Sequence, residues 1–277
     1  QVAQQAFESG GKMPGITTGL DELDEILGGW HDSDLTLVGG RPAMGKTAFL
    51  LGLAEDAAAT GIPVGVISAE QPAVQLGIRR AALASGVGAM SIRSGQIHDE
   101  DWGKISAGIA RTRDRDIRVY DRSAITLDEL IGIARKWRHA HGLRILFVDY
   151  AQRISVPGTD RITEVSLIAR GLKNLARDLD IPVVCLAQVV KGVETRTDKR
   201  PNAGDLANSD ELTREADQIL MLYRDEVYNP GSQDKGVAEI LIEKNRHGPV
   251  GYKRVRFVPE TMAFRSFRPR DEFEEAA

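Results

Sequence analysis

A glycine-rich segment carries the clearest chemistry in the chain. Gly40-Arg41-Pro42-Ala43-Met44-Gly45-Lys46-Thr47 matches the phosphate-binding pattern G-x-x-x-x-G-K-S/T. Glycines let backbone N–H groups turn toward a β-phosphate, Lys46 would neutralise the β- and γ-phosphates, and Thr47 would hold Mg²⁺. The alternative is an accidental glycine-rich turn, which the strand and helix predicted on either side disfavour. The segment predicts that a nucleotide with β- and γ-phosphates binds here together with Mg²⁺.

Two carboxylates follow predicted strands and would face this loop across a parallel sheet. Asp149 closes the apolar run 143–149 and is the expected aspartate on the Mg²⁺ side. Glu70 ends Ile67-Ser68-Ala69-Glu70 and is the candidate base that orients the attacking water. The alternatives are an ordinary strand-end carboxylate at 149 and, at 70, a glutamate favoured by the dipole of the next helix.

A third polar residue, Gln188, follows the apolar run 181–187. Its amide can donate to a phosphate oxygen while accepting from water, so it is a candidate sensor of the γ-phosphate. An ordinary amide at a strand end remains the alternative.

A parallel sheet would bring these residues together, and the sequence shows the alternation of strand-like and helical segments that such a sheet requires. Short, continuously apolar runs are typical of strands buried on both faces, and helical periodicity separates them, which predicts an α/β fold. The expected strands are 34–38, 63–68, 117–120, 144–149 and 181–187, and the expected helices are 46–59, 71–84, 99–113, 127–140 and 162–179.

The alternation of strands and helices ends in the last quarter of the chain. Runs at 218–223, 237–243, 252–258 and 262–267 have only loops between them, which predicts an antiparallel extension of the same sheet. Between strands, residues 190–212 are polar, charged and without a clear period, and we expect a long functional loop there.

Composition limits the class of protein more than its function. The 277 residues are 42% hydrophobic, without any apolar run long enough for a membrane helix and without a secretory signal, so a cytoplasmic protein with no membrane association is expected. One cysteine, Cys185, excludes an internal disulfide framework and a cysteine-based zinc site. The balance of 36 Lys and Arg against 40 Asp and Glu means that a nucleic acid would need local basic patches.

Seven segments together resemble the replicative hexameric DNA helicases of the DnaB family. In order they are GRPAMGKT, ISAEQ, LFVDYAQ, LARDLDIPVVCLAQ, DKRP, EADQILMLYRDEVYN and EILIEKNRHGPVG, and the resemblance runs from about Gly15 to Phe267. It implies a RecA-like P-loop NTPase core with a mainly parallel twisted sheet, flanking helices and antiparallel C-terminal strands. It also implies a homo-hexameric ring that hydrolyses ATP between subunits, translocates 5'-3' on single-stranded DNA and unwinds duplex at a replication fork.

The resemblance also divides the chain and implies partners. Residues 1–14 are expected to be a linker tail, 15–268 the RecA-like helicase ATPase domain and 269–277 an acidic C-terminal tail. Family members carry a preceding helical domain, so we expect this chain to begin within the linker. Primase and a helicase loader are the implied protein partners.

Carried over to this sequence, the family's motifs place Lys46, Thr47, Glu70, Asp149 and Gln188 in one subunit's half of the site. The resemblance adds Lys244 and Arg246 as cations supplied to the neighbour's γ-phosphate. Positions 244 and 246 share one face of a strand end, so both could approach one anion. A solvated basic edge that discourages strand pairing is the alternative.

The DNA-facing loop departs from the family pattern. Where relatives typically have D-L-R-E-S-G, this chain has Asp-Leu-Ala-Asn-Ser-Asp at 205–210, without the arginine and the glycine. Phosphate contact by this loop is therefore expected to be weak. Nearby cations could compensate, and the DNA-binding candidates are Lys191, Arg196, Lys199 and Arg200, with a solvated charged loop as the alternative.

A RecA- or RadA-like recombination or regulatory ring ATPase without unwinding activity is the rival function, because the fold alone does not separate the two. The match over 186–228 and the segment KNRHGP favour the helicase. A non-motor scaffold is disfavoured because Lys46, Glu70, Asp149, Gln188 and Arg246 are all present.

Overall fold

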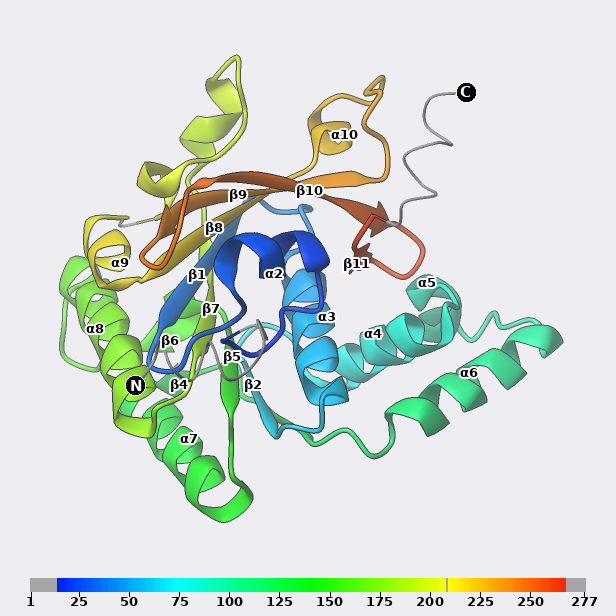
Figure 1. Ribbon diagram of the computed structural model, residues 1–277, viewed down its shortest axis with the longest axis horizontal. Helices are drawn as coiled ribbons and strands as arrows, with labels where there is room; N and C mark the ends of the chain where they lie inside the picture. The colour runs from blue at the N-terminus through cyan, green and yellow to red at the C-terminus, as the bar shows by residue number, and fades with distance from the viewer. Residues whose placement is uncertain (1–13, 208, 268–277) are drawn as a thin grey trace.

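Within residues 14–207 and 209–267, which this computed structural model describes, the centre of the protein is a nine-stranded sheet with order β11-β10-β9-β8-β1-β7-β5-β2-β3 (Figure 1). Its strands are β1 (Leu35–Gly40), β2 (Val64–Ser68), β3 (Ile117–Asp121), β5 (Ile145–Asp149), β7 (Val183–Gln188), β8 (Gln218–Tyr223), β9 (Val237–Asn245), β10 (Gly251–Val258) and β11 (Ala263–Arg265). A separate pair joins β4 (Ile125–Thr126) to β6 (Ile154–Ser155). The expected linker tail 1–14 and acidic tail 269–277 lie almost entirely outside the described residues.

Helices cover both faces of the sheet. The helices are α2 (Asp21–Leu27), α3 (Lys46–Ala59), α4 (Ala73–Ser85), α5 (Ala89–Ser94), α6 (Asp99–Thr112), α7 (Leu127–His141), α8 (Arg161–Leu179), α9 (Ser209–Glu215) and α10 (Asp225–Tyr228). Two core clusters result, one between the sheet and α7 and α8, the other between the sheet and α2 and α3. Because successive strand residues point to opposite faces, Leu37 of β1 joins the first cluster and Val38 the second.

The predicted α/β fold is confirmed, and most element boundaries agree within two residues. Strand β1 lies between β7 and β8 and pairs with both in parallel, and β5, β2 and β3 continue the parallel part. The predicted antiparallel extension is confirmed for the pairs β8–β9, β9–β10 and β10–β11. Strand β8 therefore belongs to both parts, because its other neighbour, β1, is parallel.

The expectation of a long loop over 190–212 is wrong in part. This segment contains the short 3-10 helices Lys191–Thr195 and Ala203–Asp205 and the start of α9. The physical reason is that β7 and β8 are parallel to the same strand, so the chain between them must return across the sheet in a crossover connection. Leu206 and Leu212 are buried and attach this crossover to the core.

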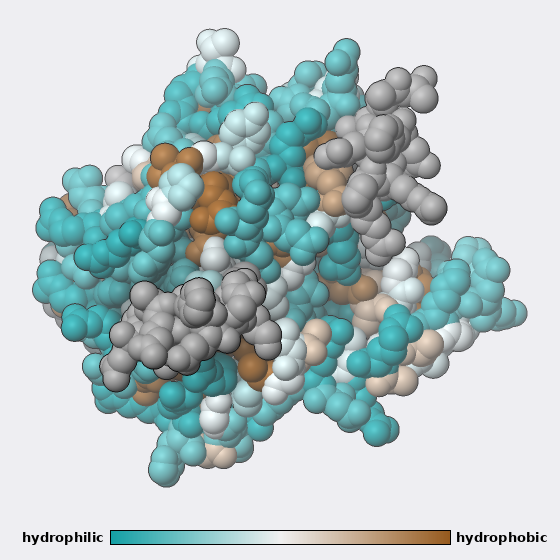
Figure 2. Space-filling view, viewed as in Figure 1, coloured by the Kyte–Doolittle hydropathy of each residue, from teal (hydrophilic) through white to brown (hydrophobic). Residues whose placement is uncertain are grey.

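The exterior is mostly hydrophilic on the face shown in Figure 2, with small separate hydrophobic areas. Exposed large apolar side chains include Met90, Trp102 and Ile162, which come from three different helices. No helix within residues 14–207 and 209–267 has the length and apolar character of a transmembrane helix.

Candidate active site

The phosphate loop connects the carboxyl end of β1 to the first residue of α3, as predicted. Gly45 has φ of 92°, and a Cβ there would lie 3.2 Å from the Phe264 ring, so this turn requires glycine. Lys46 Nζ donates to the backbone oxygen of Gly40 at 2.6 Å, which folds the side chain back over the loop. Burial lowers the pKa of Lys46, while the charges of Asp149 and Glu70 act in the opposite direction.

Asp149 meets the loop through Thr47. It is the last residue of β5, its exposed fraction is 1%, and its Oδ2 accepts a hydrogen bond from Thr47 Oγ1 at 2.8 Å. Burial raises the pKa of Asp149 to about 6; the Glu70 charge adds to this effect and the Thr47 hydrogen bond opposes it. A buried carboxylate with a raised pKa is stabilised in its charged form by a nearby cation.

This pair of oxygens fits Mg²⁺. Magnesium in nucleotide sites is held by one or two protein oxygens together with phosphate oxygens, and the Thr47 hydroxyl and Asp149 carboxylate are such a pair. Among the described residues, no group of three or more His, Cys, Asp and Glu side chains could hold a metal alone. The geometry therefore suits a cation that arrives with the nucleotide.

Glu70 and Gln188 come to the same edge of the sheet. Ser68 pairs with Asp149 across β2 and β5, so Glu70 lies two residues beyond the strand end, and its side chain is exposed. Gln188 pairs with Gly40 at the ends of β7 and β1, and its side chain is also exposed. The structure thus brings together the five residues that the motifs placed in one half-site.

Two contacts connect this half-site to the crossover segment. The Arg41 guanidinium turns away from the loop, donating from Nε to Glu194 Oε1 at 2.9 Å and from Nη1 to Val189 O at 2.9 Å. The backbone oxygen of Gln188 accepts from Ala207 N at 2.9 Å. Movement of the crossover segment would therefore displace both Arg41 of the phosphate loop and Gln188, because each is hydrogen-bonded to it.

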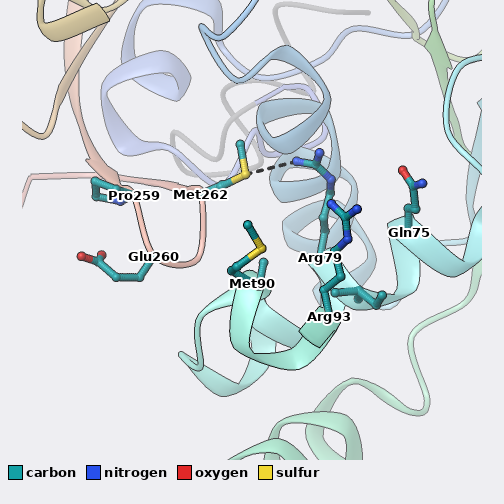
Figure 3. A pocket seen from close by; sticks show the side chains of 9 residues that line it. Gln75, Arg79, Met90, Arg93, Pro259, Glu260 and Met262 are labelled. Atoms are coloured by element: carbon teal, nitrogen blue, oxygen red, sulfur yellow. Dashed lines mark hydrogen bonds between the residues drawn. The ribbon is translucent and has the colours of Figure 1, made fainter. Parts of the chain in front are cut away.

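A cavity not anticipated from the sequence lies between α4, α5 and the β10–β11 turn (Figure 3). Arg79, Met90 and Met262 are among the side chains that line it, and Arg79 Nη1 donates to the Met262 sulfur at 3.3 Å. Burial lowers the pKa of Arg79, and the charges of Asp149 and Glu70, the two carboxylates of the candidate site, partly offset this effect. In the sequence Arg79 is one of two consecutive arginines, Arg79 and Arg80, in an otherwise largely apolar helix.

The two proposed trans cations lie at the other edge of the sheet. Gly40 pairs with Leu222 near the end of β8, whereas Lys244 pairs with Ile219 and Arg246 N donates to Asp217 O at its start. At the usual rise per residue, the separation along the strand from the level of Gly40 is about 10 Å for Lys244 and about 17 Å for Arg246. Both cations therefore face away from the phosphate loop of their own chain.

Their local partners differ. Lys244 Nζ donates to the backbone oxygens of Thr213 and Ala216 at 2.8 and 2.6 Å, which caps the C-terminal end of α9. Arg246 Nη1 donates to Asp217 Oδ1 at 2.8 Å, and its side chain remains 69% exposed. Arg246 is thus available to a neighbour, whereas Lys244 would have to leave its carbonyls.

The four DNA-binding candidates do not form one uniform patch. Arg200 donates twice to Glu239, at 2.6 and 2.7 Å, and these bonds raise its pKa. Arg196 is paired with Asp205 at 2.5 Å. Lys191 is exposed, and Lys199 lies 5.0 Å from the centre of the Tyr228 ring without an ion pair among the described residues. The structure therefore leaves the two lysines, not the two arginines, available to a phosphate.

Comparison with known proteins gives a consistent result. The family described as DnaB-like helicase C terminal domain matches residues 15–266. Replicative DNA helicase DnaB of Pasteurella multocida is 43% identical over 251 residues, which cover 88% of this chain and 54% of that protein. The protein of the same name from Geobacillus stearothermophilus is 37% identical over 270 residues, which cover 96% and 59%. The chain thus spans little more than half the length of these relatives.

Solved structures agree. The ATPase domain of G40P superposes with a TM-score of 0.92 at 32% identity, covering 96% of both chains. A DnaB-like replicative helicase, described with its interactions with primase, gives a TM-score of 0.91 at 32% identity over 96% of this chain and 65% of that one. The predicted RecA-like core is confirmed, and the chain belongs to the DnaB-like helicase C-terminal domain family.

Proposed function

We propose that this chain is the motor of a replicative DNA helicase, acting in the cytoplasm as a homo-hexameric ring that hydrolyses ATP between subunits and translocates 5'-3' on single-stranded DNA. The observation that carries the proposal is the separation of two half-sites on one sheet. The phosphate loop and carboxylates lie at one edge, and Arg246 lies at the other. A head-to-tail ring would join unlike edges, so that each nucleotide contacts two chains.

At such an interface each residue has a distinct task. The loop backbone and Lys46 would bind the phosphates, and Thr47 and Asp149 would hold Mg²⁺, which would neutralise phosphate charge when bound. Glu70 orients the water and accepts its proton, while Gln188 contacts the γ-phosphate. Arg246, and Lys244 if it leaves α9, approach the γ-phosphate from the neighbouring chain. The cavity beside Arg79 would receive the nucleoside portion, since the charges of Asp149 and Glu70 act on Arg79, one of the residues that line it.

The relatives' names favour a helicase over a recombination or regulatory ATPase. Primase is a proposed partner because one similar structure is described with it. A helicase loader is proposed from the family resemblance alone.

Mixing two inactive variants tests the shared site. Lys46→Ala and Arg246→Ala should each lower multiple-turnover ATPase activity by up to about 10³-fold. A mixed ring places an intact loop beside an intact cation at about a quarter of randomly formed interfaces, so the mixture should recover activity. The matched control mixes Arg246→Ala with the double variant Lys46→Ala/Arg246→Ala, which supplies no intact cation and should recover none. Absence of recovery in rings shown to exchange subunits would assign Arg246 to its own chain's site.

A further inference from the structure

A buried carboxylate lies directly behind Arg246, at the edge remote from the phosphate loop. Asp217 is 1% exposed and sits immediately before β8. Its side chain accepts three hydrogen bonds, from Arg246 Nη1 at 2.8 Å, Leu35 N at 2.8 Å and Lys173 Nζ at 2.5 Å. Its backbone is also paired, because Asp217 N donates to Leu35 O and Asp217 O accepts from Arg246 N.

This carboxylate is fixed and remains charged. Burial on its own would raise the pKa of Asp217, but the hydrogen bonds from Lys173, Leu35 N and Arg246 outweigh burial and lower it. Lys173 comes from α8 and also donates to Ser33 O at 2.8 Å, so it is anchored independently of Arg246. Lys173 is thus a second cation beside Asp217, and its charge also acts on the neighbouring carboxylate Asp34.

This second cation bears on the purpose of the Arg246–Asp217 pair. Lys173 binds Asp217 from a more buried position, with 15% of its side chain exposed against 69% for Arg246, so Asp217 does not depend on Arg246 alone for its charge. Without Arg246, Asp217 would still accept hydrogen bonds from Lys173 and Leu35 N. The contact does, however, restrict a long side chain that otherwise samples many rotamers.

We propose that Asp217 is a positioning residue for the trans cation: it holds one edge of the Arg246 guanidinium, so that the remaining N–H groups point outward at a neighbouring chain's γ-phosphate. The inference rests on the proposed function of Arg246. Asp217 itself touches no nucleotide and acts only through the arginine. Lys173 and Leu35 N hold the Asp217 carboxylate against α8 and β1. Asp217 in turn holds the Arg246 guanidinium in a fixed position relative to the central strands of the sheet.

The test is Asp217→Asn. The amide oxygen can still accept from Leu35 N and Lys173, but the amide nitrogen would face Arg246 as a donor and release it. We expect kcat to fall by about 10- to 100-fold, as displaced catalytic groups typically cause, while KM and nucleotide binding stay within about threefold. The double variant Asp217→Asn/Arg246→Ala should be no slower than Arg246→Ala alone, because both changes remove the same interaction.

Mixed rings show which half of the shared site the Asp217→Asn variant impairs. Asp217→Asn should be complemented by Lys46→Ala, which supplies an intact cation, and not by Arg246→Ala, which supplies none. The matched control is Glu55→Gln, another buried carboxylate that binds two arginines, Arg80 and Arg115, away from this edge. We expect it to lower the melting temperature without this pattern of complementation.

Each result has a distinct meaning. Wild-type kcat for Asp217→Asn, alongside an inactive Arg246→Ala, would overturn the positioning role and leave the proposed function intact. Additive losses in the double variant, or failure of Lys46→Ala to complement, would make Asp217 a purely structural residue. Full activity of Arg246→Ala would instead overturn the proposed trans cation itself.

Discussion

At the residue level, the two carboxylates of the candidate site differ in environment and therefore in task. Asp149 is buried and bonded to Thr47, and its raised pKa favours partnership with a cation. Glu70 is exposed beyond the end of β2, where a water molecule can reach it. Burial thus distinguishes the proposed metal-side aspartate from the proposed base, although both follow strands that end at the same edge.

Replacing Glu70 with Gln tests that division. The amide keeps the shape of the side chain but cannot accept a proton, so we expect unchanged nucleotide affinity and hydrolysis slower by about 100-fold or more. Single-turnover hydrolysis and equilibrium nucleotide binding should be measured on the same preparation. Hydrolysis at the parent rate with normal binding would show that another group activates the water.

A half-buried acid, Asp56 of α3, gives a prediction about stability and pH. Burial raises its pKa to about 6, against the opposing charges of Arg265 and Arg115. Since the folded-state pKa lies above the ordinary value of 3.8, the stability that protonation contributes is complete below pH 3.8 and is lost as pH rises through about 6. Asp56→Asn mimics the protonated form and should raise the melting temperature by a few degrees at pH 8.

The gain from Asp56→Asn should shrink as pH falls toward 4, where the parent protein is itself protonated. Asp178→Asn, which alters an exposed carboxylate paired with Arg135, is the control and should show little pH-dependent gain. Thermal unfolding without nucleotide over this pH range provides the measurement. Equal stabilisation by Asp56→Asn at pH 4 and pH 8 would contradict a burial-raised pKa.

At the level of elements, the sequence predicted what depends on local pattern. Asp149, Glu70 and Gln188 were found because each follows an apolar run that ends at the phosphate-loop edge, and Lys46 because its motif is contiguous. Periodicity also located the long helices. Lys244 and Arg246 came only from the family resemblance, since their spacing says nothing about a second chain.

What the sequence could not show depends on contacts between distant residues. Arg200 is paired with Glu239, thirty-nine residues away, and no local pattern distinguishes it from Lys199, which has no ion pair within the described part of the chain. The crossover over 190–212 was missed because it is polar and its helices are short. Its buried core side chains, Val193, Leu206 and Leu212, are too few to produce a period. Arg79 was missed for the same reason: its relation to the carboxylates exists only after α4 packs.

These contacts refine the expectation for DNA binding. Lys191→Gln/Lys199→Gln should weaken single-strand binding for all sequences and reduce the slope of log affinity against log salt by about two, because two phosphate contacts are lost. Arg200→Gln should leave that slope unchanged and instead lower thermal stability, because it leaves Glu239 without its partner. Labelled oligonucleotides in a salt series, with a non-hydrolysable nucleotide, provide the assay.

If Arg200→Gln instead lowered the slope of log affinity against log salt and the lysine variant left it unchanged, the Arg200–Glu239 pair would have to open when DNA binds.

A further variant, Asp210→Asn, tests the effect of the acidic residue in this segment. It removes an exposed negative charge from the first turn of α9 and should raise single-strand affinity, while retaining the helix better than glycine would.

At the level of the whole molecule, the central sheet connects the two half-sites rigidly. Strand β1 carries the phosphate loop at its carboxyl end, and its first residue, Leu35, binds Asp217 at the other end. The crossover joins Gln188 through Ala207 and continues into α9, whose last turn holds Lys244. A ring built from such units would couple each nucleotide site to the next through the sheet and to DNA through the crossover.

Activity should therefore depend on assembly in a way that nucleotide binding does not. Because the proposed site needs residues from two chains, ATPase activity per chain should fall steeply on dilution through the concentration range in which particle mass falls from hexamer to monomer. Binding of a fluorescent nucleotide should weaken less over this range, since the phosphate loop, Thr47 and Asp149 all belong to one chain. Particle mass, turnover and binding should be measured at the same concentrations and nucleotide level. Constant activity per chain in samples that are monomeric by mass would mean that one chain holds a complete site, and Arg246, a strand length from its own phosphate loop, would then have no part in hydrolysis.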